Sequence, residues 1–222
     1  MQIAIDGPAG SGKSSLCRII ADKYGFIYVD TGAMYRSVTW LTERFGKDNP
    51  EEKARNAKFI FSDNGKKIAV EYKGEVFDLT DAIRTPEISS KVSAVASSAP
   101  MRKILVEKQR KYAESGDVIM EGRDITTVVL PQADIKIFLT ASPEERAARR
   151  FKEWKDKENM PAYEEVLAEI IKRDEADSSR ADSPLKQAKD AVLLNTDGLT
   201  LDQAAEKIGA MITAKREQGK NS

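Results

Sequence analysis

The sequence contains no histidine and only one cysteine among its 222 residues. Without histidine, any mechanism that uses an imidazole base or imidazole metal ligands is excluded. The single cysteine, Cys17, rules out an internal disulfide. This is typical of a reducing compartment, so we expect a cytoplasmic location. Cys17 lies among Leu16, Ile19 and Ile20 on a predicted helix, where we expect its thiol to pack rather than react.

An excess of charge and long apolar runs are also missing. Lys plus Arg and Asp plus Glu number 36 each, whereas a protein that binds nucleic acid through the phosphate backbone usually carries a basic surplus. No apolar run approaches the roughly 18 residues that a membrane span requires. We therefore expect neither a nucleic-acid partner nor a membrane partner.

Apolar strand-like segments alternate with helical patterns along most of the chain. The predicted strands cover residues 2–6, 26–29, 117–121, 134–140 and 191–195. The predicted helices cover about 13–24, 33–45, 143–154, 161–176 and 200–215. This alternation predicts an α/β fold in which helices cover both faces of a central parallel sheet. We expect residues 1–222 to form one domain.

Residues 58–79 interrupt the alternation. Their sequence, KFIFSDNGKKIAVEYKGEVFDL, alternates apolar with polar residues and contains an Asn64-Gly65 turn signal. This pattern predicts a small antiparallel β meander inserted into the α/β fold. A peripheral hairpin without a functional role is the alternative interpretation.

The clearest motif is GPAGSGKSS, which begins at residue 7 directly after the first predicted strand. It matches G-x-x-x-x-G-K-[ST], a loop whose backbone amides turn toward phosphates at the N-terminus of a helix. Lys13 would reach the outer phosphates, and the Ser14 hydroxyl would bind Mg²⁺. A purely structural glycine turn is the alternative. The predicted ATP phosphate site consists of Gly7, Pro8, Ala9, Gly10, Ser11, Gly12, Lys13, Ser14 and Ser15.

Two further clusters follow predicted strands. Asp30 or Thr31 could cap the next helix, but a cap does not explain Arg36, which suits a second phosphate group in the crevice at the strand ends. Arg123 and Asp124 follow the strand 117–121 in the same way.

Two helical patterns add more charge. Arg173, Asp177 and Arg180 would share one helix face through i+4 and i+7 spacing, with surface ion pairs as the alternative. The i, i+3, i+4 spacing of Arg146, Arg149 and Arg150 would gather three guanidiniums on one side. That group either contacts phosphate or forms a solvated helix face.

A nucleotide-type loop with surplus arginines indicates phosphoryl transfer, which requires charge neutralisation and alignment. If the acceptor is itself a phosphate, its second pKa near ~6 leaves it ionised at neutral pH. Such an acceptor requires no general base, which agrees with the missing histidine.

The chain resembles the bacterial-type cytidylate kinases from Ile3 to about Thr200. The motifs occur in the family's order: IDGPAGSGKS, YVDTGAMYR, the meander, AIRTPEIS, EGRDI with TVVLP, KIFLTAS, ERAARR and IKRDEADSSR. The resemblance implies phosphorylation of CMP or dCMP by ATP with Mg²⁺, carried out by a monomer. It also implies a P-loop kinase core with a monophosphate-binding region at about 31–105 and a mobile lid at about 146–160.

The resemblance also implies roles for single residues. The positions that match contacts to CMP are Asp30, Thr31, Arg36, Ser93, Arg102, Arg123, Asp124, Arg173, Asp177 and Arg180. Among these, Arg36, Arg123 and Arg180 match the arginines that hold the acceptor phosphate. Thr31, Ser93, Arg102 and Asp124 match positions around cytosine, and Arg173 and Asp177 match positions at the ribose. The implied catalytic residues are Lys13, Arg123, Arg146, Arg150 and Arg180.

Two residues depart from the family pattern. Thr31 stands where many relatives carry serine; the hydroxyl survives, but the added methyl group restricts χ1. Thr126 stands where glycine is common. Because threonine does not easily adopt a positive φ, either this turn does not require one or its geometry shifts.

Three other functions compete with this one. An adenylate or uridylate kinase would share the loop, but the meander and the Arg102/Asp124 pair favour a cytidylate kinase. A P-loop switch or motor usually has an aspartate-ended strand for Mg²⁺, whereas the strand here ends in Glu121, and no Asn-Lys-x-Asp motif is present. A nucleic-acid-binding ATPase is disfavoured by the zero net charge.

Overall fold

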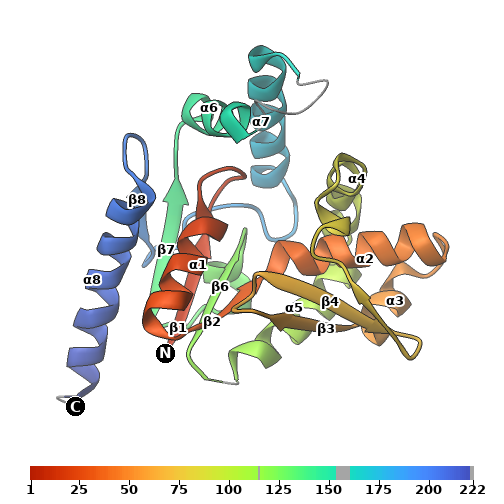
Figure 1. Ribbon diagram of the computed structural model, residues 1–222, viewed down its shortest axis with the longest axis horizontal. Helices are drawn as coiled ribbons and strands as arrows, with labels where there is room; N and C mark the ends of the chain where they lie inside the picture. The colour runs from red at the N-terminus through yellow and green to blue at the C-terminus, as the bar shows by residue number, and fades with distance from the viewer. Residues whose placement is uncertain (115, 154–160, 221–222) are drawn as a thin grey trace.

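The computed structural model describes residues 1–114, 116–153 and 161–220 (Figure 1). Five parallel strands form a central sheet in the order β2-β6-β1-β7-β8. The strands are β1 (Gln2–Asp6), β2 (Ile27–Asp30), β6 (Val118–Gly122), β7 (Ile135–Thr140) and β8 (Val192–Asn195). The predicted α/β fold with a parallel sheet is confirmed, and no strand end differs from its predicted position by more than one residue.

Helices cover both faces of the sheet because its strands carry apolar side chains on both sides. Ile3 and Ile5 pack with α1 (Lys13–Tyr24) and α8 (Leu201–Lys220). Ala4, which points to the opposite face, belongs to a second core with α2 (Thr31–Phe45) and α5 (Ala99–Ala113). This period of two within a continuous apolar run is the mark of a strand that is buried on both faces.

The helices α3 (Pro50–Asn56), α4 (Pro86–Ser97) and α5 have no counterpart among the predicted elements. Their local signals are nevertheless present in the sequence. Thr85 accepts a hydrogen bond from the Ile88 amide, Ser98 accepts one from the Met101 amide, and a proline lies in the first turn of each of these two helices. Such caps fix helix starts. A cap also moves the start of α2 to Thr31, two residues earlier than predicted, because Asp30 accepts from the Ala33 amide.

The predicted meander is confirmed as an antiparallel sheet of β3 (Lys58–Ser62), β4 (Lys67–Tyr72) and β5 (Glu75–Asp78). It packs against the core at two places. Phe59 and Val70 are buried in the same core as α2 and α5. The tip of its first hairpin contacts the end of α1, where Asn64 Nδ2 donates to Asp22 Oδ1 at 2.9 Å and Lys66 pairs with Asp22 at 3.2 Å.

The helices α6 (Pro143–Glu153) and α7 (Tyr163–Ser178) stand beyond the carboxyl ends of the strands (Figure 1). They share a small core of Ala147, Val166 and Ile170. The expected lid at about 146–160 begins on α6, and its residues 154–160 lie outside the described residues. None of the helices in the described part of the chain has the length and apolar composition of a membrane span.

Gly65, at the hairpin tip, has a positive φ of 73°, and a Cβ atom placed there would lie 2.5 Å from the Tyr28 carbonyl oxygen. Gly74, in the next turn of the same sheet, has φ 82°, and a Cβ atom placed there would meet no atom within 4 Å. Both Gly→Ala variants carry the left-handed strain, but only Gly65→Ala forces the tip away from β2. We expect Gly65→Ala to lose about 1–3 kcal/mol more unfolding free energy than Gly74→Ala in urea denaturation. Equal losses would show that the tip is not seated on β2.

Candidate active site

A large cleft lies at the carboxyl ends of β1, β2 and β6, with a volume of about 1150 Å³. Every predicted site residue lines it except Gly7 and Pro8, which are buried. Twelve Lys and Arg side chains and four carboxylates line this cleft, although the whole chain is electrically neutral. Folding has therefore concentrated positive charge at one place, as expected for a site that binds several phosphate groups.

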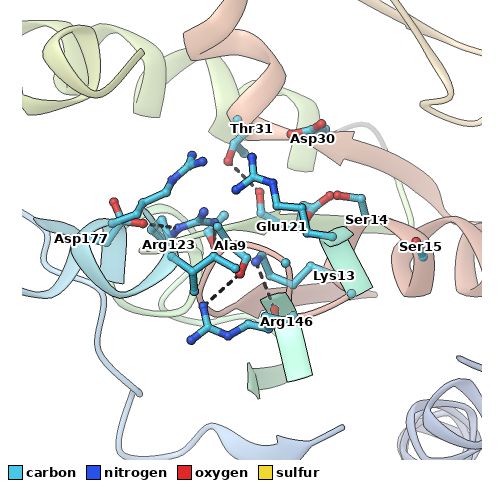
Figure 2. A pocket seen from close by; sticks show the side chains of 18 of the residues that line it. Ala9, Lys13, Ser14, Ser15, Asp30, Thr31, Glu121, Arg123, Arg146 and Asp177 are labelled. Carbon is cyan, nitrogen blue, oxygen red and sulfur yellow. Dashed lines mark hydrogen bonds and ion pairs between the residues drawn. The ribbon is translucent and has the colours of Figure 1, made fainter. Parts of the chain in front are cut away.

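The loop between β1 and α1 forms the floor of the cleft (Figure 2). Gly7 approaches β7 so closely that a Cβ atom there would lie 1.9 Å from the Leu139 carbonyl oxygen, so no other residue fits. Lys13 Nζ donates to the carbonyl oxygens of Gly7 at 2.9 Å and Pro8 at 2.7 Å. Burial and the nearby Arg123 guanidinium lower the pKa of Lys13 to about 7.

Glu121, near the end of β6, is a buried carboxylate beside the loop. The Tyr28 hydroxyl donates to its Oε1, and the Ser14 side chain also hydrogen-bonds to it. Burial and the negative charge of Asp30 raise the pKa of Glu121. Sequence reasoning considered Glu121 only as a strand end in a switch or motor and did not include it in the site. Its position at the carboxyl end of a buried strand was the signal that could have identified it.

The junction of β2 and α2 brings Asp30, Thr31 and Arg36 to the cleft. Of the two candidate caps, Asp30 is the N-cap of α2. Its carboxylate also accepts a hydrogen bond from Arg36 Nη2 at 2.9 Å. Although burial opposes the shift, the Arg36 guanidinium and the Ala33 amide lower the pKa of Asp30. The Thr31 hydroxyl donates to the Glu121 carbonyl oxygen at 2.6 Å. This contact ties the start of α2 to β6.

Arg102 and Asp124 meet across the cleft wall, one from α5 and the other from the turn after β6. Arg102 Nη2 donates to Asp124 Oδ2, and both side chains are less than 10% exposed. Arg102 Nε is buried and has no hydrogen-bond partner among the described residues. Ser93, on α4, lines the same cleft. The buried pair therefore retains donor capacity that a ligand could use.

Asp177 on α7 holds two arginines. It accepts from Arg123 Nε at 2.7 Å and from Arg180 Nη2. Although burial opposes the shift, the charge of Arg123 lowers the pKa of Asp177. Burial and the like charge of Arg123 lower the pKa of Arg173 to about 10. This wall of the cleft therefore combines burial with a high density of positive charge.

Arg180 does not share a helix face with Arg173 and Asp177, so that part of the prediction is wrong. The helix α7 ends at Ser178, two residues before Arg180. Arg180 nevertheless pairs with Asp177, three residues before it. Further along the chain, the Leu185 amide donates to the Asp177 carbonyl oxygen at 2.8 Å.

Arg146, Arg149 and Arg150 all line the cleft from α6, but each has its own partner. Arg146 is buried; it pairs with Asp174 on α7 and donates to the Ala9 carbonyl oxygen at 3.1 Å (Figure 2). Arg149 donates to the Thr196 carbonyl oxygen at 2.8 Å, and Arg150 lies 3.7 Å from Glu169. The expected gathering of the three guanidiniums on one side is thus present, and a separate carboxylate or carbonyl partner for each offsets the repulsion between the like charges.

Sequence reasoning missed two more arginines that line the cleft, Arg18 and Arg84. Both lie close enough to Asp30 to lower its pKa. Arg18 follows Ser14 by one turn of α1 and so faces the same side, which was the signal for it. Arg84 lies in a short helical turn far along the chain, and its signal was its place in the AIRTPEIS motif.

The chain is similar to known proteins in sequence and in fold. A sequence profile of the family described as cytidylate kinase matches residues 3–214. The cytidylate kinase of Carboxydothermus hydrogenoformans is 45% identical, covering 98% of this chain and 99% of that protein. The cytidylate kinase of Bacillus licheniformis is 46% identical over 97% of each, and that of Caldanaerobacter subterraneus is 48% identical over 94% of this chain and 92% of the relative.

Solved structures share the fold at low sequence identity. The shikimate kinase of Bacteroides thetaiotaomicron matches with a TM-score of 0.52 and 14% identity, covering 96% of this chain and 98% of that one. A protein of Thermus thermophilus, TT1252, matches with a TM-score of 0.50 and 17% identity over 97% of each chain. These similarities establish the P-loop kinase fold and nothing finer.

The low pKa of Lys13 predicts proton uptake when phosphate binds. At pH 8 most Lys13 side chains are neutral in the empty cleft, since their pKa is about 7. A polyphosphate beside Nζ favours the charged form and raises that pKa, while the nucleotide phosphates themselves are already ionised. ADP binding at pH 8 should therefore take up as much as about one proton, measured by calorimetry in buffers of different ionisation enthalpy.

The matched control is Lys13→Arg. Its guanidinium is already protonated at pH 8 before ADP binds, so it has no proton to take up. It should bind ADP without the proton uptake. A binding enthalpy that does not depend on the buffer in the unaltered protein would contradict the lowered pKa.

Proposed function

The chain belongs to the cytidylate kinase family, and on this premise we propose how its cleft carries out the reaction. The protein transfers the γ-phosphoryl group of ATP to CMP or dCMP and releases ADP and CDP or dCDP. The observation that carries the proposal is the charge of the cleft, where twelve cationic side chains and four carboxylates surround a phosphate-binding loop. Phosphoryl transfer requires this neutralisation and alignment of phosphates.

The donor nucleotide binds at the floor of the cleft. Backbone amides of residues 7–15 hold the ATP phosphates, and Lys13 exchanges its present contacts with the Gly7 and Pro8 carbonyls for the outer phosphates. An ammonium on a flexible stem can follow the phosphoryl group as it moves. Lys13 therefore contributes mainly to the transition state.

The acceptor phosphate binds to Arg36, Arg123 and Arg180. Each of these guanidiniums already pairs with a carboxylate, either Asp30 or Asp177. An entering phosphate adds charge-assisted hydrogen bonds to guanidiniums that the carboxylates already hold in place. Because CMP carries an ionised phosphate at neutral pH, no base has to remove a proton from the attacking oxygen.

The remaining acceptor contacts recognise the nucleoside. Asp124 accepts from the exocyclic amine of cytosine, Arg102 donates to N3 and O2, and Thr31 and Ser93 complete the base site. Arg173 and Asp177 hold the ribose. Thr31 acts through a hydroxyl that already donates to the Glu121 carbonyl and therefore accepts from the ligand.

Arg146 and Arg150 supply positive charge to the phosphoryl group in transfer, together with Lys13, Arg123 and Arg180. Arg146 also holds the loop, because its guanidinium donates to the Ala9 carbonyl. The lid that carries these residues extends over about 146–160, and the monophosphate-binding region extends over about 31–105. We further propose that the enzyme works as a cytoplasmic monomer with residues 1–222 as one domain; the single buried thiol, Cys17, agrees with a reducing compartment.

Mg²⁺ fits at Ser14 and Glu121. Their hydroxyl and carboxylate oxygens lie together beside the loop, and hard oxygen ligands are those that Mg²⁺ prefers. Among the described residues, no group of three or more acidic, histidine or cysteine side chains could hold a metal by itself. This agrees with an ion that the nucleotide phosphates bind in part. When bound, Mg²⁺ neutralises charge between the β- and γ-phosphates.

The proposed reaction is tested by measuring ADP release from ATP with CMP, dCMP, UMP and AMP in turn. We expect turnover with CMP or dCMP to exceed turnover with UMP and AMP, because only cytosine matches the Arg102/Asp124 pair.

Lys13→Ala should abolish transfer with an unchanged circular dichroism spectrum, the loss lying mainly in kcat. Equal turnover with all four acceptors, or near-normal turnover in Lys13→Ala, would contradict the proposal.

Replacing Asp124 with Asn tests the base contact. The Asn amide can donate to O4 of uracil but opposes the amine of cytosine, so the ratio of kcat/KM for CMP over UMP should shrink by about tenfold or more. Asp182→Asn is the matched control, because it removes an exposed carboxylate 3.9 Å from the same Arg102 guanidinium. It should leave the ratio unchanged. An equal fall of both substrates in Asp124→Asn would mean that Asp124 only supports the structure.

A further inference from the structure

Asp6 is a buried acid that the proposed reaction does not use. It ends β1 directly before the phosphate-binding loop, is 0% exposed and does not line the cleft. Burial raises the pKa of Asp6 to about 6, against the effect of its hydrogen bonds. An acid in this environment is costly to retain unless its oxygens are well occupied by donors.

Among the described residues, the hydrogen-bond donors to the Asp6 carboxylate come from one turn. The amides of Ile125 and Thr126 donate to its two oxygens at 2.8 Å each, and the Thr126 hydroxyl donates to Oδ2 at 2.6 Å. Thr126 is 1% exposed and likewise does not line the cleft. The hydroxyl is therefore committed to Asp6.

The turn held in this way begins at Asp124. Residues Ile125–Val129 form a single π-helical turn, in which the Asp124 carbonyl oxygen accepts from the Val128 and Val129 amides at 2.8 and 3.2 Å. The Asp6 carboxylate accepts from the amides of the two residues after Asp124, and Arg102 donates to the Asp124 side chain itself. The direction of the Asp124 carboxylate thus depends on a contact with the strand that leads into the phosphate-binding loop.

We propose that Thr126 and Asp6 are positioning residues for base recognition, which hold Asp124 at a fixed place relative to the phosphate-binding loop. The proposal rests on the proposed role of Asp124 in contacting cytosine. Neither residue touches the nucleotide; both act through the backbone of the turn. Loss of the Thr126 hydroxyl leaves Asp6 Oδ2 with one donor fewer, so the turn relaxes and Asp124 moves from the position that suits cytosine.

Thr126→Val tests the proposal because valine keeps the shape of threonine and removes the donor. We expect KM for CMP to rise roughly three- to tenfold with a smaller change in kcat, and the CMP/UMP ratio of kcat/KM to fall by a similar factor. Thr126→Ser keeps the hydroxyl and should restore both values. Thr127→Val is the matched control on the same turn. The Thr127 hydroxyl makes a long contact of 3.5 Å with the Asp124 carbonyl oxygen and no hydrogen bond with Asp6.

The outcomes separate this proposal from a purely structural role. If Thr126→Val lowers the melting temperature but leaves KM and the CMP/UMP ratio as in Thr127→Val, the proposal is overturned. An equal loss for CMP and UMP also overturns it. If Thr126→Val does not fold, Thr126→Ala against Thr126→Ser provides the same comparison without placing a methyl group next to the Asp6 carboxylate.

Asp124→Asn is measured in parallel. If Asp124→Asn changes the CMP/UMP ratio and Thr126→Val does not, only the positioning role fails. If Asp124→Asn leaves the ratio unchanged, the proposed contact between Asp124 and cytosine fails, and the positioning role fails with it.

Discussion

Carboxylates in the cleft wall that pair with arginines are the constraint on which the cleft depends. Twelve cationic side chains line one cavity, and like charges at this density repel unless anions separate them. Asp30, Asp124 and Asp177 provide that separation, since each holds at least one arginine in a hydrogen-bonded pair. Removing one partner of such a pair would leave a buried charge unpaired, which typically costs about 3–5 kcal/mol. The cleft therefore keeps its shape and its charge before any phosphate binds.

Burial shifts the pKa values of two groups at the loop, Lys13 and Glu121, in opposite directions. Lys13 and Glu121 are both buried, so burial lowers the pKa of the amine and raises that of the carboxyl. A polyphosphate beside Lys13 and a divalent cation beside Glu121 would each favour the charged form. In the free protein, burial disfavours the charged forms of both groups. A nucleotide with its metal ion would stabilise these charged forms, and this stabilisation contributes to the binding free energy.

The phosphate-binding loop, the strands and the inserted meander could be predicted because their signals are local. Gly7 and Lys13 belong to one short motif, the strands are short continuous apolar runs, and the Asn64-Gly65 turn lies inside its own hairpin. Glu121 and Asp6 escaped because a single acid at the end of a strand has no pattern around it. Only the pairing of β1 with β6 shows that Asp6 faces the turn after Asp124. Thr126, which stood out as a departure, acquires a role only through that distant partner.

The sequence by itself determined the fold class and the chemistry of the loop, because residues that lie next to one another in the chain make both. It also limited the mechanism, since a chain without histidine and with 36 charges of each sign excludes several kinds of site. Tertiary structure alone decided which carboxylate from a distant part of the chain an arginine meets. Arg146 pairs with Asp174 on another helix, and Arg123 pairs with Asp177, which is 54 residues away in the chain. The physical reason is that Coulomb energies and hydrogen bonds depend on distances of a few ångströms in space, and spacing along the chain sets those distances only within one element.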